Sequence, residues 1–134
     1  MAAKLSEGQI QLLKGPNFAF LATLMPDGRP QVSPVWVEFD GKHVVINSEV
    51  KRAKVRNLKR DPRVSLAVAN PSNPYEYVEI RGKVVDMTTE GAFEDIDNLA
   101  KKYLGQDKYP YNQEGDQRII LKVEPLEVVG YPSS

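Results

Sequence analysis

The sequence predicts a mainly β fold in which about six antiparallel strands, with three helices beside them, form a single domain over residues 1–134. Apolar and polar residues alternate over short segments, and turn-forming sequences such as Pro26-Asp27-Gly28 and Asp40-Gly41 separate the first of these segments. The chain length also suits one domain of ordinary size. Strands joined by such short turns close most easily into a small barrel. A β-sandwich would satisfy the same alternation, so periodicity alone leaves both architectures open.

The strands follow from this alternation and from their content of β-branched and aromatic residues. They are expected at residues 18–25, 31–39, 43–47, 63–69, 75–87 and 118–123. In the fifth of them, Val78 and Ile80 share the face that should be buried, opposite Tyr75 and Tyr77.

Capping chemistry and residue spacing predict three helices. Ser6-Glu7-Gly8-Gln9 is a capping box, and the helix that it starts should end at Gly15-Pro16. A weak helical spacing between residues 49 and 61 predicts a second, short helix. Apolar residues at three- and four-residue spacing over residues 93–104 predict an amphipathic helix that packs on the core and ends at Gly105.

Composition and charge exclude several classes of function. The chain has no cysteine and one histidine, so disulfides, thiolate metal sites and cysteine nucleophiles are excluded. Its 18 basic and 18 acidic residues cancel, which argues against a general nucleic-acid binder. No apolar run reaches the roughly 18 residues of a membrane span, and the N-terminus lacks the apolar region of a signal peptide. We therefore expect a cytoplasmic protein without membrane or nucleic-acid partners, in which any anion site is local.

One segment is strongly basic. Six cations occur between residues 51 and 60: Lys51, Arg52, Lys54, Arg56, Lys59 and Arg60. Ser48, just before them, is the expected N-cap of the second helix, where free N–H groups and the helix dipole favour an anion. Arg52 and Lys54 would add charge-assisted hydrogen bonds to phosphate oxygens. A solvated helix face and a nucleic-acid patch are the alternatives, the latter disfavoured by net neutrality.

Ordered motifs along the chain carry a resemblance to a known superfamily. They are Ala22-Thr23-Leu24 with Pro26-Asp27-Gly28-Arg29-Pro30, Ser33-Pro34-Val35-Trp36, Arg52-Ala53-Lys54-Val55-Arg56-Asn57-Leu58, Asp61-Pro62-Arg63-Val64, Tyr77-Val78-Glu79-Ile80-Arg81-Gly82, Tyr103-Leu104-Gly105 and Arg118-Ile119-Ile120. The set resembles the pyridoxamine 5′-phosphate oxidase-like, FMN-binding split-barrel superfamily, and within it the small F-420-dependent oxidoreductases. The resemblance implies a six-stranded antiparallel split β-barrel with flanking helices. It also implies a homodimer with two cofactor sites at the subunit interface.

The resemblance places the ring of the cofactor against three segments. The backbone of Ser33-Pro34-Val35-Trp36 would run along the ring edge, and Asn47 and Ser48 would line the ring and the ribityl chain. From the second subunit, Tyr75 and Tyr77 would wall the other side of the ring. Packing for Trp36 and simple exposure for the two tyrosines are the alternative interpretations.

The phosphate end of the cofactor is placed at the basic segment. Arg52 and Lys54 match the phosphate ligands of the superfamily, with Lys51 and Asn57 as helpers. Arg118 would approach the same cleft, although it could instead only pair with a carboxylate.

The predicted function is hydride transfer from reduced coenzyme F-420 to an unsaturated small-molecule acceptor. No paired carboxylates, Ser/His constellation or metal-ligand spacing is found in the sequence, so the residues suggest no catalytic group and no metal site. This suits an enzyme whose cofactor performs the hard step. An FMN-dependent oxidoreductase of the same fold and a non-catalytic flavin or deazaflavin carrier are the alternatives. A true pyridoxamine phosphate oxidase is disfavoured because residues 126–134 contain no arginine for the phosphate of its substrate.

Overall fold

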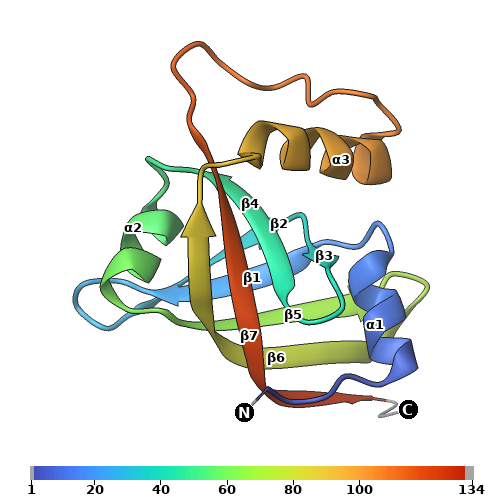
Figure 1. Ribbon diagram of the computed structural model, residues 1–134. Helices are drawn as coiled ribbons and strands as arrows, with labels where there is room; N and C mark the ends of the chain where they lie inside the picture. The colour runs from blue at the N-terminus through green and yellow to red at the C-terminus, as the bar shows by residue number, and fades with distance from the viewer. Residues whose placement is uncertain (1, 132–134) are drawn as a thin grey trace.

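A single curled, antiparallel sheet forms the body of the protein (Figure 1), and a computed structural model describes it over residues 2–131. The seven strands run in the order β2-β1-β5-β6-β7-β4-β3. Their bounds are β1 Ala19–Leu24, β2 Pro30–Val35, β3 Glu38–Phe39, β4 Val44–Glu49, β5 Arg63–Asn70, β6 Asn73–Thr88 and β7 Arg118–Tyr131. One continuous sheet excludes the sandwich. The prediction of a mainly β split barrel is confirmed, whereas the predicted strand number of six is wrong.

The extra strand arises because the expected strand 31–39 is broken at Trp36 and Val37. The N–H of Val37 donates to the hydroxyl of Tyr103 over 3.0 Å, and its carbonyl accepts from the Nζ of Lys102 over 2.6 Å. Side chains of a distant helix therefore satisfy backbone groups that a continuous strand would pair with its neighbour. The alternation itself survives the break, since Val35 and Val37 are both buried.

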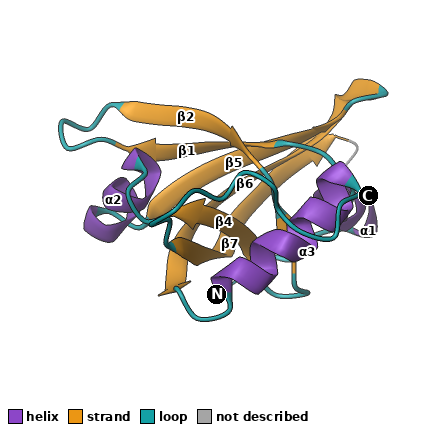
Figure 2. Cartoon of the chain, turned by 90° about the horizontal axis from the view of Figure 1, so that it is seen from above, coloured by secondary structure: helices purple, strands orange, loops and turns teal. Residues whose placement is uncertain are grey.

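Three helices accompany the sheet: α1 Glu7–Lys14, α2 Ala53–Arg60 and α3 Ala92–Leu104. Seen from above, all three lie to one side of β1 and β2 (Figure 2). The predicted capping box is confirmed, because Ser6 Oγ accepts from the N–H of Gln9 and the Gln9 side chain accepts from the N–H of Ser6. Gly105 ends α3 in the left-handed conformation, with φ of 68°. None of the helices in residues 2–131 is long and apolar enough to cross a bilayer.

The core lies inside the curl of the sheet. The largest fully buried side chains come from five strands and α1: Leu13, Leu21, Ile46, Leu66, Ile80 and Leu121. In β6 the expected alternation is confirmed, with Val78 and Ile80 buried and Tyr75 and Tyr77 exposed. Helix α3 buries Ile96, Leu99 and Ala100 but leaves Phe93 46% and Leu104 37% exposed, so the expectation that its whole apolar set packs on the core is only partly met.

The opposite face of the sheet carries apolar side chains that no residue in 2–131 buries. Register places Pro34, Phe20, Ala67, Glu79 and Val129 side by side across β2, β1, β5, β6 and β7. Phe20 and Val129 are 55% and 40% exposed, and Val32 in the next row is 63% exposed. We call the surface formed by Phe20, Val32, Pro34, Ala67 and Val129 the open sheet face.

Candidate functional site

A pocket of about 180 Å³ opens where β4 and β7 approach the ends of β2, α2 and α3. Its lining residues are Phe18, Pro34, Val35, Trp36, Asn47, Ser48, Glu49, Arg52, Lys54, Ile96, Tyr109 and Arg118. Most of the residues that the sequence nominated are therefore brought to one cavity from segments as far apart in the chain as residues 34 and 118. Helices α2 and α3 flank this region in Figure 1.

Three cations converge on the pocket: Arg52, Lys54 and Arg118. None of them forms an ion pair with a carboxylate in residues 2–131. Burial, with repulsion from Arg52 and Arg118, lowers the pKa of the half-buried Lys54 amine below its usual 10.5. Like charges held together at a cost in this way favour an anionic ligand, which would relieve the repulsion.

The start of α2 adds to this positive field. Arg52 is the N-cap of the helix and its side chain makes no capping hydrogen bond, so the first turn faces the pocket uncapped by a side chain. The predicted cap at Ser48 is wrong, because Ser48 lies within β4, opposite Ile119 of β7. The strand continues for two more residues than expected, to Glu49, and Ser48 instead lines the pocket as a buried hydroxyl.

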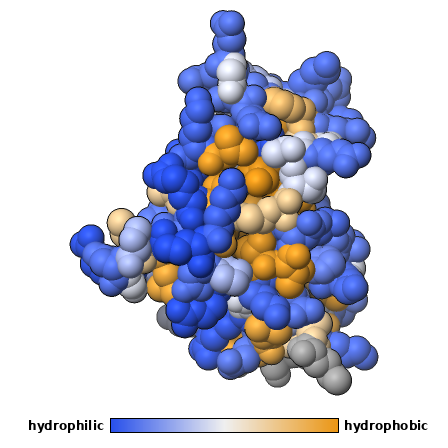
Figure 3. Space-filling model, turned by 60° about the vertical axis from the view of Figure 1, so that its left-hand side comes forward, coloured by the Kyte–Doolittle hydropathy of each residue, from blue (hydrophilic) through white to orange (hydrophobic). Residues whose placement is uncertain are grey.

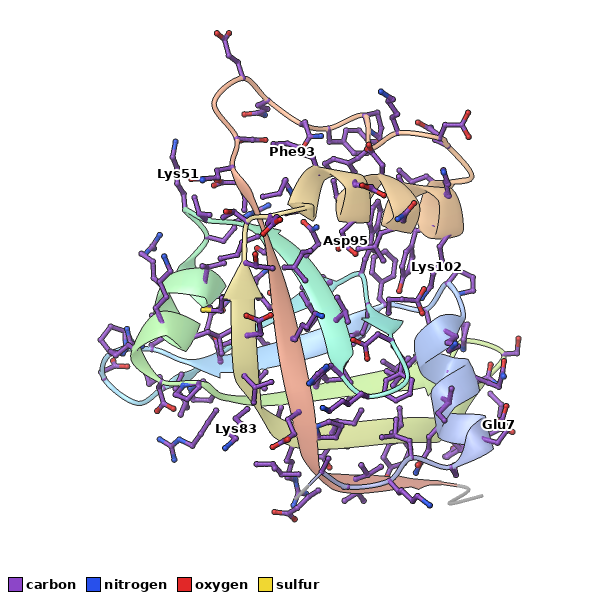
Figure 4. The ribbon with its side chains drawn as sticks, in the orientation of Figure 1. Glu7, Lys51, Lys83, Phe93, Asp95 and Lys102 are labelled. Carbon is purple, nitrogen blue, oxygen red and sulfur yellow. The ribbon has the colours of Figure 1, made fainter. Side chains whose placement is uncertain are left out.

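Arg118 is 9% exposed and is held in place through neutral contacts. Its Nε donates to Oδ1 of Asn47 over 2.9 Å, and its guanidinium lies 5.2 Å from the centre of the Tyr109 ring. The amide of Asn47 in turn donates to the carbonyl of Ala92 at 2.8 Å and to the Asp95 carboxylate at 2.9 Å. Asp95 lies between α3 and β4 (Figure 4), and burial raises its pKa. The alternative that Arg118 only pairs with a carboxylate is therefore wrong, because its contacts are with Asn47 and Tyr109.

Aromatic side chains form another part of the site, and two of them, Trp36 and Tyr109, line the pocket. The rings of Trp36 and Tyr103 stack with centroids 5.0 Å apart and planes 4° from parallel. Tyr109 meets Trp36 edge-on at 5.7 Å and 88°. The sequence prediction missed Phe18, Glu49, Ile96 and Tyr109. Tyr109 lies in the loop between α3 and β7, where no periodicity predicts the direction of its side chain. Ile96 belongs to the apolar set of α3 that the sequence predicts to pack on the core.

The remaining nominated residues lie outside the pocket. Lys51 is exposed and points away from the sheet (Figure 4). The side of the molecule that carries α2 is largely hydrophilic, with apolar patches between the polar side chains (Figure 3). The Asn57 amide donates to the Thr23 hydroxyl at 3.0 Å inside the fold. Ser33 has a buried Oγ without a hydrogen-bond partner in residues 2–131. Tyr75 and Tyr77, near the turn between β5 and β6, are 80% and 37% exposed. Their roles stay predictions.

Metal and acid–base chemistry find no support in the described residues. Among residues 2–131 no group of three or more His, Cys, Asp or Glu side chains is placed to hold a metal ion. The carboxylate of Glu49 in the pocket accepts backbone N–H groups of Lys51 at 2.9 Å and Gln117 at 3.3 Å. These bonds lower its pKa, the Lys51 contact most, and keep it a poor proton acceptor. The pocket is thus equipped for binding and orientation.

Comparison with known proteins agrees with this geometry. The family model for pyridoxamine 5′-phosphate oxidase matches residues 6–130. Among solved structures, an F420 reductase superimposes with a TM-score of 0.82 at 35% identity, over 93% of this chain and 98% of that one. A candidate pyridoxamine 5′-phosphate oxidase from Lactobacillus delbrueckii has a TM-score of 0.67 at 26% identity, over 95% and 94%. HupZ of Group A Streptococcus shares the fold alone, with a TM-score of 0.68 at 19% identity over 98% and 97%.

Fold and site together define a split-barrel protein of the flavin-related oxidoreductase class. The chain belongs to the pyridoxamine 5′-phosphate oxidase family, whose model spans nearly all of it. The resemblance predicted from the ordered motifs is thereby confirmed at the level of the superfamily.

Proposed function

We propose that this protein transfers a hydride from reduced coenzyme F-420 to an unsaturated organic acceptor. The observation that carries the proposal is a set of three cations, without ion pairs in residues 2–131, on a pocket that is also lined by the aromatic rings of Trp36 and Tyr109. A phosphorylated tricyclic cofactor presents the complementary pair of features, an anionic phosphate and a flat ring.

On the phosphate side, Arg52 and Lys54 bind and neutralise the phosphate, and Lys51 lies close enough in sequence to assist. The planar guanidinium of Arg52 supplies two parallel donors, whereas the Lys54 ammonium acts as a point charge. Arg118, buried and held by Asn47, contributes a third positive charge without moving. These residues fix the register of the ligand along the pocket.

On the ring side, the Ser33–Trp36 segment, Asn47 and Ser48 orient the cofactor so that one ring face stays open to the acceptor. When bound, reduced F-420 supplies the hydride, and the accompanying proton comes from a tyrosine hydroxyl or from solvent. The contribution of the chain is then binding, orientation and electrostatics. The acceptor meets a shallow cleft.

We further propose that the working unit is a homodimer that closes the site. The pocket of about 180 Å³ is smaller than the roughly 300 Å³ at which pockets for such ligands begin, so one chain alone does not enclose the cofactor. Pro34 belongs both to the pocket and to the open sheet face. A second copy on that face would cover the apolar side chains and wall the pocket with Tyr75 and Tyr77 of the partner.

FMN on the same residues is the alternative cofactor. F-420 carries an acidic tail beyond its phosphate, and the exposed cations Lys51, Arg56 and Lys59 beside the pocket favour that longer anion. The 35% identity to an F420 reductase supports the same choice. A carrier without a substrate of its own is the alternative from another class of function.

Parallel titrations with F-420 and FMN, followed by cofactor fluorescence, test the assignment. We expect saturable binding with F-420 the tighter ligand, and tighter FMN binding would transfer the proposal to FMN. Turnover then separates an enzyme from a carrier. If the loaded protein oxidises reduced F-420 no faster than buffer across quinones, enones and tetrapyrroles, the protein is a carrier. Flat titrations with both cofactors would refute the cofactor site.

A further inference from the structure

Helix α3 is attached to the pocket wall by more than packing. Asp95 accepts from Asn47, which holds Arg118, and Asp97 accepts from the backbone N–H of Tyr109 at 2.9 Å. Tyr103 stacks on Trp36, and Ile96 lines the pocket itself. Four positions of one helix therefore reach the aromatic and Arg118 sides of the pocket.

Two of the three cations are placed independently of this helix. Arg52 is the N-cap of α2 and Lys54 lies in its first turn, and within residues 2–131 neither makes a side-chain hydrogen bond to α3. The two ends of the proposed ligand thus rest on different elements. A change in α3 can disturb one end and leave the other in place.

The Tyr103 hydroxyl makes the most consequential of these attachments. It accepts from the N–H of Val37 at 3.0 Å and donates to the carbonyl of Asn17 at 2.6 Å. It thereby closes the gap where β2 stops and β3 begins, directly beside Trp36. Burial raises the pKa of Tyr103 to about 12, so the hydroxyl keeps its proton and both hydrogen bonds at neutral pH.

Asp97 plays the corresponding part for Tyr109. Its carboxylate fixes the backbone of Tyr109 in a loop, residues 106–117, that has no helix or strand of its own. That anchor sets the Tyr109 ring edge-on to Trp36 and over the guanidinium of Arg118. Without it, only side-chain contacts would hold the ring.

We propose that Tyr103 and Asp97 are positioning residues that hold Trp36 and Tyr109 as the ring-binding wall, and that they determine affinity for the tricyclic ring and not for the phosphate. The inference rests on the proposed function for the identity of the ligand. The position of Trp36 itself, however, can be measured without any ligand.

The test compares two ligands on three variants. The ligands are the cofactor that binds in the parallel titration and its phosphate-free ribityl fragment, both followed by ring fluorescence. Tyr103→Phe and Asp97→Ala should each weaken both ligands by the same factor, about three- to tenfold, as expected for one or two lost hydrogen bonds. Lys54→Ala should weaken only the phosphorylated ligand. Equal affinities in the α3 variants and the wild type, or loss confined to the phosphorylated ligand, would overturn the proposal.

Matched controls remove the same groups where they anchor nothing in the pocket. Tyr111→Phe deletes the hydroxyl of a tyrosine that is 64% exposed, and Glu94→Ala removes an exposed carboxylate on α3. Both should bind the two ligands as the wild type does. If Tyr103→Phe does not fold, as judged by circular dichroism, Asp97→Ala alone decides the outcome.

A ligand-free measurement separates this inference from the proposed function. The chain has one tryptophan, so its emission reports on Trp36 alone. Tyr103→Phe should shift that emission and increase its quenching by acrylamide, whereas Tyr111→Phe should not. An unchanged signal in Tyr103→Phe refutes the positioning role even if the cofactor binds. A changed signal together with no binding of either cofactor refutes only the proposed function.

Discussion

The environment of the Lys54 side chain favours ligand binding over the stability of the fold. Its ammonium group is half-buried beside two guanidinium groups, Arg52 and Arg118, and burial and repulsion together lower its pKa. A cation held in this way destabilises the folded protein and strengthens the binding of an anionic ligand. The charge is therefore better explained by what it binds than by what it stabilises.

Replacing Lys54 by alanine should weaken cofactor binding by about 1.5–3 kcal/mol, the usual scale for hydrogen bonds to charged groups. Fluorescence titration at moderate salt measures the loss, and Arg52→Lys should also weaken binding because a point charge replaces a planar fork. Lys83→Ala, an exposed lysine on β6 (Figure 4), is the control and should bind normally. An unchanged dissociation constant in Lys54→Ala would place the phosphate elsewhere.

The lowered pKa of Lys54 also predicts a pH dependence with a definite sign. A bound anionic phosphate offsets the repulsion and raises the pKa of Lys54 again, so binding takes up a proton between the two pKa values. Affinity should therefore fall as pH rises from neutral toward 10.5, the usual pKa of lysine. Titrations across this range in Lys54→Arg, which stays charged, should show a flat profile. A wild-type affinity that rises with pH would contradict the assignment.

At the scale of elements, the bend of β6 against β7 shapes the sheet. Its register shifts at Arg81/Gly82 and again between Val84 and Asp86, so a strand of 16 residues can follow the curl. Gly82 is required here because a Cβ at this position would collide with the backbone oxygen of Glu124. The atom that the Cβ would meet belongs to the backbone of β7, so it cannot move aside as the end of a flexible side chain could.

Gly82→Ala should accordingly lower the free energy of unfolding by about 3 kcal/mol, near the upper end of overpacking costs. Urea denaturation at fixed protein concentration measures the change. Gly15→Ala is the matched control, because its Cβ would meet the end of the Asn17 side chain at 2.9 Å and would stay 3.3 Å from the nearest backbone atom, the oxygen of Gln11. That variant should change the free energy by less than about 1 kcal/mol. Equal effects of the two substitutions would show that the close approach at Gly82 is relaxed in solution.

At the scale of the whole molecule, the open sheet face is the largest unexplained feature of a single chain. Four of the five adjacent strands present apolar or small side chains there, including Phe20, Val32 and Ala67, while β6 presents Glu79 and the buried side chains lie on the opposite face. A stable dimer buries roughly 1,200–2,000 Å² in total, and a face that spans five strands can supply an area of that order. The proposed site needs such a partner to be complete.

Phe20→Asp should therefore convert the dimer to a monomer in sedimentation or light-scattering measurements. It should also weaken cofactor binding, although it lies outside the pocket, because Tyr75 and Tyr77 of the partner would be lost. Phe93→Asp introduces the same charge at another exposed phenylalanine, on α3, and should leave the dimer intact. A wild-type protein that is monomeric at micromolar concentration would contradict the proposed assembly.

The sequence by itself determined the local elements and nominated two cations for one end of the site. Alternation placed Val78 and Ile80 in the core, the capping box started α1 at the expected residue, and the ordered motifs identified the superfamily. Arg52 and Lys54 could be nominated because a run of cations is visible in one dimension. These features depend on residues close together in the chain, which is why periodicity and capping rules reach them.

Only the tertiary structure decided what depends on contacts between distant segments. Tyr103 and Lys102 break the expected strand at Val37 from more than sixty residues away, and Asn47 fixes Arg118 across the β4–β7 pair. Tyr109 reaches the pocket from a loop without any periodic signal. The hydrogen-bonding groups of the backbone pair with whichever side chains the fold brings near them. No local sequence pattern encodes which distant residue supplies that partner.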